Sequence, residues 1–176
     1  MEDVIGPLRD FHRLHIEPMI GRPTGASASE VAELAATLGE TLPEAYVQFL
    51  LWMGKDYSGV YRGTDIFITD VLNNTAALPE FLEEHGIAPP SGRYVCYQSH
   101  QGYFMAWFLL PAVSADPAVF VFREGQNSNE PIAAGSFCSY TLTELRDLAN
   151  VLTGSRASAQ RKSLLSKIRD FLVRRR

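Results

Sequence analysis

The spacing of apolar residues predicts two helices in the first third of the chain. From Ser27 onward, apolar residues recur every three or four positions, which indicates an amphipathic helix that ends at Gly39. Ser27 and Glu30 have the spacing of a capping box at its start. The next segment, LPEAYVQFLLWMG, has Pro43 at a position suited to a first helical turn and is apolar on almost every side. We expect this second helix to be buried on more than one face.

Beyond the second helix the apolar pattern changes to short runs rich in β-branched and aromatic residues, which indicates strands. These runs are YSGVYRGTDIFITDV (57–71), RYVCYQS (93–99), YFMAWFLL (103–110) and AVFVFRE (118–124). Gly102 lies between the second and third runs and can supply the positive φ of a tight hairpin. The third run is apolar throughout, so we expect a central strand that is covered on both faces.

Two more helices are predicted around these strands. The segment NNTAALPEFLEEHG is expected to be capped by Asn73 or Asn74 and closed by Gly86. In TLTELRDLANVLTG, Thr141 and Glu144 have capping-box spacing. Because successive strands are joined by hairpins rather than helical crossovers, we predict an α+β fold. Its central antiparallel sheet of about four to six strands packs against N-terminal helices and a C-terminal helix.

The chain is predicted to have three parts: an N-terminal extension (1–26), one domain (27–154) and a basic amphipathic C-terminal helix (155–176). The extension contains glycine and proline, so we expect at most a short helix there. With 176 residues, 46% of them hydrophobic, the chain can bury a core without a disulfide or metal. The start is acidic, and no apolar run approaches the roughly 18 residues of a membrane helix. We therefore expect a soluble, cytoplasmic protein.

The net charge of −4 conceals two opposite regions. Up to Gly154 there are 8 basic and 19 acidic residues, whereas the remainder has 8 basic residues and one acidic residue. An acidic body repels nucleic acid and attracts basic proteins, although acidity can also serve solubility alone. The basic tail could fold back on the acidic body, contact anionic lipid or bind nucleic acid, and the first option needs no partner.

Candidate catalytic and metal-binding groups are sparse. His12 and His15 could share a helical face, but no acidic or cysteine partner nearby completes a metal site. His100 lies in the predicted hairpin turn without an evident orienting partner. The sequence has no phosphate-binding glycine loop and no nucleophile elbow. We predict that the protein is not an enzyme and has no cofactor, metal or small-molecule substrate.

Three motifs together resemble the SUKH superfamily, which includes fungal cell-wall synthesis regulators and many bacterial immunity proteins. They are LPEAYVQFL, the hairpin HQGYFMAWF, and VFVFREG followed by SFCSYTLTEL. The resemblance covers about Ser27 to Leu152. The chain departs from the family at Ala35 and Ala36, where a glutamate is common. The resemblance implies binding to a cognate toxin, which is silenced inside the cell that makes it.

Exposed aromatic residues interleaved with charges are the best candidates for a binding surface, because tyrosine and arginine are enriched in interface hot spots. We expect Tyr57, Tyr61 and Tyr103 to be anchors, and Asp56, Asp65 and Glu124 to steer a basic partner. The full candidate set is Asp56, Tyr57, Tyr61, Arg62, Asp65, Tyr97, His100, Tyr103, Glu124 and Gln126. The alternative is that these tyrosines only edge the core and that the polar turn is simply solvated.

The sequence therefore predicts a non-enzymatic immunity-type protein that neutralises a bacterial toxin, such as a nuclease, by covering its active cleft. One alternative is a general intracellular interaction or regulatory scaffold of the same fold. A second alternative is a peripheral membrane or nucleic-acid binder that acts through the basic tail.

Overall fold

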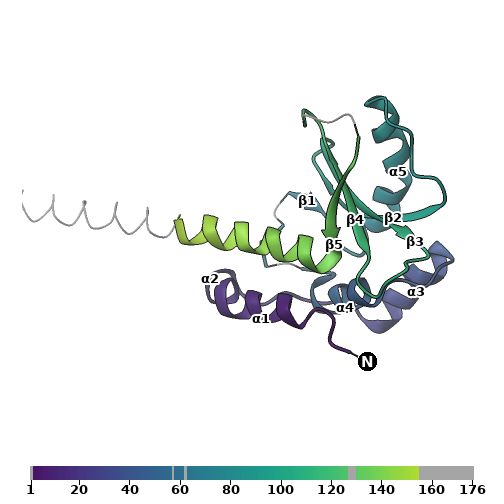
Figure 1. Cartoon of the computed structure of the whole chain (residues 1–176). Coiled ribbons are helices and arrows are strands. Elements are labelled where there is room, and N and C mark those ends of the chain that lie inside the picture. The colour runs from purple at the N-terminus through teal and green to yellow at the C-terminus, as the bar shows by residue number, and fades with distance from the viewer. Residues whose placement is uncertain (1, 57, 62, 127–129, 155–176) are drawn as a thin grey trace, which may run out of the picture.

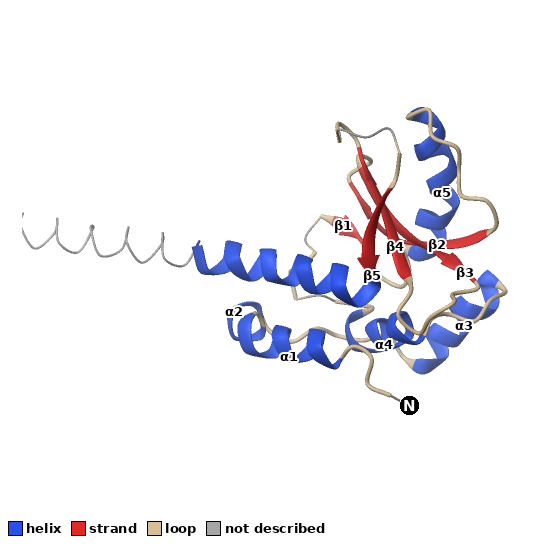
Figure 2. Ribbon diagram, in the orientation of Figure 1, coloured by secondary structure: helices blue, strands red, loops and turns tan. Residues whose placement is uncertain are grey.

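The computed structural model describes residues 2–56, 58–61, 63–126 and 130–154. Within these residues, five strands form one antiparallel sheet in the order β1-β2-β3-β4-β5, with helices on both faces (Figure 1, Figure 2). The strands are β1 (Thr64–Asp65), β2 (Arg93–His100), β3 (Phe104–Leu110), β4 (Ala118–Arg123) and β5 (Ile132–Ser136). The helices are α1 (Gly6–His15), α2 (Glu17–Ile20), α3 (Ala28–Leu38), α4 (Glu44–Met53), α5 (Val71–Glu84) and a last helix over residues 137–154. The predicted α+β class is confirmed.

The two faces of the sheet bury separate hydrophobic clusters. On one face, Leu78, Phe81 and Leu82 of α5 cluster with Trp107 of β3. On the other face, α1, α3, α4 and the last helix share the larger core. β3 lies between the two clusters, which explains why its sequence is apolar on both sides.

Tyr46 of α4 is the centre of the larger core. Its side chain is 0% exposed, and its ring centroid lies 5.1 Å from that of Phe108 in β3 and 5.6 Å from that of Phe137 in the last helix. Tyr97 of β2 lies 5.9 Å away, and Phe49 packs on Phe137 at 5.3 Å. Such ring pairs add about 0.5–1.5 kcal/mol each beyond the burial of their area. The cluster therefore joins α4, the sheet and the last helix, as the all-round apolar pattern of α4 predicts.

The capping signals of α3 are confirmed. Ser27 Oγ accepts a hydrogen bond from the Glu30 N–H, and the Glu30 carboxylate accepts one from the Ser27 N–H at 2.8 Å. Gly39 ends the helix with φ 67°, in the left-handed region that favours glycine.

The N-terminal residues contain more helix than the sequence predicts. Ile5, Leu8 and Ile16 are buried in the same core as α3 and α4, so α1 and α2 form in spite of nearby prolines. Gln48 of α4 anchors the segment, because its Oε1 accepts hydrogen bonds from the N–H groups of Val4 and Ile5. The division of the chain at residue 26 stays a prediction. The predicted C-terminal helix over 155–176 lies outside the described residues.

The β2–β3 hairpin forms where the sequence predicts it. Gln101 and Gly102 have φ values of 48° and 75°, the positive values that a tight hairpin turn requires. The sheet extends beyond this hairpin, because β3 pairs with β4 and β4 pairs with β5, both antiparallel.

β2 contains a bulge that sequence alternation does not reveal. Cys96 pairs with Trp107 and Gln98 pairs with Ala106, so Tyr97 is an extra residue without a partner in β3. The bulge shifts the alternation by one position. Val95 and Tyr97 lie in the core on the face covered by the last helix, and the shift places Gln98 and His100 on that face as well.

The segment 57–71 differs from the predicted strands. Among its described residues, only Thr64–Asp65 forms a strand. Ile66 is buried, and the Asp70 carboxylate accepts a hydrogen bond from the Phe67 N–H at 2.9 Å, which turns the chain into α5. The predicted N-terminal cap of α5 at Asn73 or Asn74 is also wrong: α5 begins at Val71, and the buried Asn74 side chain donates to the Asp65 carbonyl instead. The predicted end at Gly86 is confirmed, because α5 ends at Glu84 and Gly86 has φ 72°.

The last helix begins one turn earlier than predicted. Ser136 Oγ accepts a hydrogen bond from the Ser139 N–H, which is the capping role that the sequence analysis assigns to Thr141. Thr141 is inside the helix and 1% exposed. The reason is that Phe137 is buried against Tyr46, which fixes the start of the helix at that residue. Among the described helices, none is long and apolar enough to cross a membrane.

Gly25 marks the closest backbone approach between the N-terminal segment and α4. A Cβ atom there would lie 1.7 Å from the Leu51 carbonyl oxygen, and the adjacent Ala26 N–H donates to the Leu50 carbonyl at 2.8 Å. We expect Gly25→Ala to lower the free energy of unfolding by about 2–4 kcal/mol, through the clash and the lost hydrogen bond. Urea unfolding followed by tryptophan fluorescence measures this. Gly154→Ala is the control, because its Cβ meets open space; equal midpoints for the two variants would contradict the prediction.

Candidate functional site

A polar pocket of about 300 Å³ lies at the turn end of the β2–β3 hairpin, next to the last helix. We call it the Glu144 pocket. It is lined by Val60, Tyr61, Thr64, Gln98, His100, Tyr103, Phe104, Arg123 and Glu144. The residues come from the 58–64 segment, three strands, the hairpin turn and the last helix, so the pocket depends on the complete fold.

Glu144 is the central acceptor of the pocket. Its Oε1 accepts a hydrogen bond from Gln98 Nε2 at 3.0 Å, and its Oε2 accepts one from the Tyr61 hydroxyl at 3.1 Å. Tyr140, one turn earlier on the same helix, also hydrogen-bonds to this carboxylate. Burial raises the pKa of Glu144 to about 7, although these three hydrogen bonds and the charge of Arg123 act in the opposite direction. The carboxyl group therefore changes its charge near neutral pH.

The hairpin turn supplies an aromatic wall. The rings of His100 and Tyr103 meet edge to face at 5.1 Å. His100 Nδ1 is hydrogen-bonded to Thr64 Oγ1 at 2.7 Å, which fixes the imidazole ring against β1. Arg123 lies with its guanidinium carbon 5.3 Å from the centroid of the Phe104 ring, a cation–π contact at the rim.

Two buried oxygen atoms near Glu144 lack hydrogen-bond partners among the described residues. Gln98 is 4% exposed, and its Oε1 has no partner although its Nε2 does. The hydroxyl of Tyr97 is also without a partner, and burial raises its pKa well above the ordinary value. A buried polar atom without a partner costs about 1–3 kcal/mol, which is characteristic of a site that is not optimised for stability alone.

Three of the residues predicted from the sequence meet in this pocket: Tyr61, His100 and Tyr103. Their convergence follows from the antiparallel pairing of β1 with β2, in which Thr64 lies opposite His100. Tyr57 and Arg62 lie outside the described residues.

The other predicted residues lie elsewhere. Tyr97 is 1% exposed and belongs to the same core as Val95, two residues earlier in β2, so it offers no surface to a partner. Asp56 is exposed and accepts a hydrogen bond from the Ser58 N–H, and Asp65 is exposed in β1. Glu124 follows the pocket residue Arg123 and is exposed, whereas Gln126 stabilises the β4–β5 turn through the Arg123 N–H and the Glu130 carbonyl.

The sequence analysis did not identify Gln98, Arg123 and Glu144 as site residues. The sequence pairs Glu144 with Thr141 as a capping box. In the structure both Thr141 and Leu145, the residue after Glu144, are buried, so Glu144 lies on the same side of the helix as the core. A carboxylate on the apolar face of a helix is a signal that could have identified it. Gln98 had no such signal, because only the bulge places it on this face.

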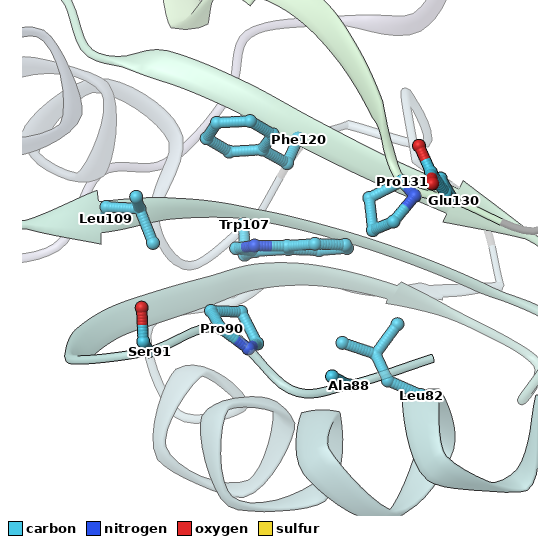
Figure 3. Close-up of a pocket in the computed structure, with 9 residues that line it drawn as sticks. All are labelled: Leu82, Ala88, Pro90, Ser91, Trp107, Leu109, Phe120, Glu130 and Pro131. Atoms are coloured by element: carbon cyan, nitrogen blue, oxygen red, sulfur yellow. The ribbon is translucent and has the colours of Figure 1, made fainter. Parts of the chain in front are cut away.

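A second cavity, of about 340 Å³, lies on the opposite face of the sheet (Figure 3). The Trp107 ring is stacked with Phe120 at a centroid distance of 6.2 Å, and it lies between Phe120 on one side and Leu82 and Pro90 on the other. The cavity is mainly apolar, and none of the predicted site residues lines it. The Glu144 pocket therefore remains the stronger candidate.

Metal ligands do not gather in the part of the chain that the structure describes, where no group of three or more histidine, cysteine or acidic side chains could hold an ion. His12 is buried against Trp52, and this burial lowers its pKa. Cys96 and Cys138 are free thiols, and burial raises the pKa of each to about 12. What the Glu144 pocket offers is a set of hydrogen-bond acceptors between aromatic walls.

The comparison with protein families identifies one relationship. The model of the SMI1 / KNR4 family (SUKH-1) matches residues 25–140, more than half of the chain. The match covers α3, α4, α5 and the entire sheet, and it ends inside the last helix, before Glu144. A search of curated proteins finds no match.

The raised pKa of Glu144 predicts a specific loss of stability with rising pH. The ordinary pKa is 4.5, so the folded protein holds this proton more tightly than the unfolded chain between about pH 4.5 and 7. The free energy of unfolding should therefore fall across this range and level off above it, by on the order of 2–3 kcal/mol. Glu144→Gln should remove this component and be more stable than the wild type at pH 8.

Urea unfolding at pH 5 and pH 8 measures the difference between the two proteins. The control is Glu83→Gln, which removes the same charge from an exposed position in α5. Parallel pH profiles for wild type and Glu144→Gln would contradict the assignment of a buried, ionisable Glu144.

Proposed function

This chain belongs to the SMI1 / KNR4 family (SUKH-1), and from that premise we propose that it is an immunity-type protein that binds and neutralises a basic toxin domain. SUKH proteins act through protein–protein interaction and are often immunity-type or regulatory. In this proposal the protein acts inside the cell that makes the toxin. It binds the toxin without catalysing a reaction and covers the toxin's active cleft.

The observation that carries the proposal is the excess of acidic residues up to Gly154, in a domain that also presents a structured aromatic pocket. Residues up to Gly154 include 19 acidic and only 8 basic side chains. Several of the basic residues are already in surface ion pairs, such as Lys55 with Glu30 and Arg93 with Glu40. Glu80, Glu83 and Glu84 are exposed on α5 and form no ion pair with any described residue. Such a surface accelerates association with a basic protein and disfavours nucleic acid.

The hairpin turn beside the Glu144 pocket offers an anchor to a partner. Tyr103 is 36% exposed, and its backbone is fixed on both sides: its N–H donates to the His100 carbonyl, and its carbonyl accepts from the Glu124 N–H at 2.8 Å. A tyrosine held in this way contributes contact area with little loss of conformational entropy. Glu124 is adjacent and exposed, so it can steer a cationic partner toward Tyr103.

The proposal is tested with the gene next to the one that encodes this chain. We expect that gene to encode a large protein with a toxic C-terminal domain, and we expect co-expression of this chain to restore growth. Tyr103→Ala should weaken binding about tenfold or more, as measured by calorimetry with an inactivated toxin domain. Binding by the wild type should also weaken as salt is raised.

Tyr94→Ala is the matched control, because Tyr94 is a half-buried tyrosine of the same strand pair that packs on the opposite face of the sheet. Equal loss of binding in both variants would show that Tyr103 is not an anchor. Growth inhibition that persists in the presence of the wild-type protein would overturn the proposed function.

A further inference from the structure

The Glu144 carboxylate receives hydrogen bonds only from neutral groups among the described residues. Its donors are the Gln98 amide and the hydroxyls of Tyr61 and Tyr140. No lysine, arginine or histidine of the described chain forms an ion pair with it. A carboxylate has about four acceptor positions, so three donors leave about one position open. This half-buried charge is therefore hydrogen-bonded by the protein but forms no ion pair with any described residue.

The rest of the pocket also favours a donor. Gln98 lines the pocket, is 4% exposed, and has a buried Oε1 without a partner in the described structure. The walls include Tyr61, Tyr103 and Phe104, whose ring faces attract cations. Unused acceptors, a half-buried carboxylate and aromatic walls are together complementary to a cation that carries several N–H groups.

We propose that the Glu144 pocket binds a guanidinium or ammonium group. This assignment rests on the proposed function: the group is the side chain of an arginine or lysine that the basic partner inserts. The volume of about 300 Å³ is sufficient for such a group. Glu144 and Gln98 accept its N–H donors, and the tyrosine rings exclude water around it.

Arg123 is the charge that opposes this cation. It lines the pocket at the rim, where Phe104 holds it in a cation–π contact. It must therefore reduce the affinity for a bare cation, and its removal should increase that affinity. A ligand that bound through its own carboxylate would lose affinity when Arg123 is removed. The effect of an Arg123 variant therefore distinguishes a bound cation from a bound anion.

The affinity of the pocket for a cation depends on pH through the titratable groups that face Glu144. These are Arg123, His100 and the hydroxyls of Tyr61, Tyr97, Tyr103 and Tyr140. Burial raises the pKa values of Tyr97 and Tyr140, so both remain neutral. Because the pKa of Glu144 is about 7, affinity for a cation should rise with pH below 7 and level off above it.

The test is a titration of the full-length protein with methylguanidinium, followed by the NMR signals of the Gln98 side-chain amide. Methylurea, which has nearly the same shape without the charge, is the matched ligand, and sodium chloride keeps the ionic strength constant. We expect saturable shifts with methylguanidinium and none with methylurea. Glu144→Gln should weaken binding about tenfold or more and reduce its pH dependence, whereas Arg123→Gln should strengthen binding several-fold.

Loss of folding is distinguished from loss of the site by the spectrum, since both variants must retain the dispersed signals of the wild type. Absence of saturable methylguanidinium binding by the wild type would overturn the proposal. Equal affinity of wild type and Glu144→Gln, or weaker binding by Arg123→Gln, would overturn it as well.

A second arm identifies the source of the cation. If the partner supplies it, the toxin domain displaces methylguanidinium from the wild type and binds Glu144→Gln more weakly. If methylguanidinium binds as expected but no toxin domain is bound, the pocket takes a free small amine or guanidine; the proposed function then fails while this inference stands. If the toxin domain binds but methylguanidinium does not, this inference fails while the proposed function stands.

Discussion

The burial of Tyr46 among aromatic rings from three other elements is the constraint on which the structure depends. Tyr46 contacts Phe108 of β3, Tyr97 of β2 and Phe137, the first residue of the last helix. These contacts fix both the start and the direction of the last helix. Glu144, two turns further along, is consequently placed beside the hairpin turn. The position of the polar pocket is thus a consequence of hydrophobic packing that contains none of its polar groups.

The same architecture contains a conflict between stability and binding. The core is dense and apolar, yet it surrounds a carboxyl group with a raised pKa and a glutamine oxygen without a partner. Hydrophobic residues at these positions would give a more stable domain. Retention of such groups at one end of an otherwise regular sheet is the pattern expected where recognition, rather than folding, determines which residues are present.

Local signals in the sequence predicted much of the fold, and long-range packing accounts for the remainder. The capping box at Ser27, the glycine end at Gly39 and the turn at Gly102 depend on neighbouring residues, so each was predicted correctly. The predicted start of the last helix was wrong because Ser136 and Thr141 can each cap a helix. Only the burial of Phe137 against Tyr46 selects Ser136, the earlier of the two.

The candidate site was predicted only in part for the same reason. Tyr61, His100 and Tyr103 were predicted as binding residues because they are aromatic residues next to charged ones, and they meet in one pocket. Gln98 was beyond sequence reasoning, because strict alternation along β2 assigns it to the wrong face; the same alternation from Val95 places Tyr97 in the core, where the structure has it. The bulge at Tyr97 has a wider implication for comparing family members: a single-residue gap in this strand of an alignment signifies a change in which side chains face the last helix. Two proteins could thus share the sheet, the hairpin and the aromatic centre while differing entirely in what they recognise.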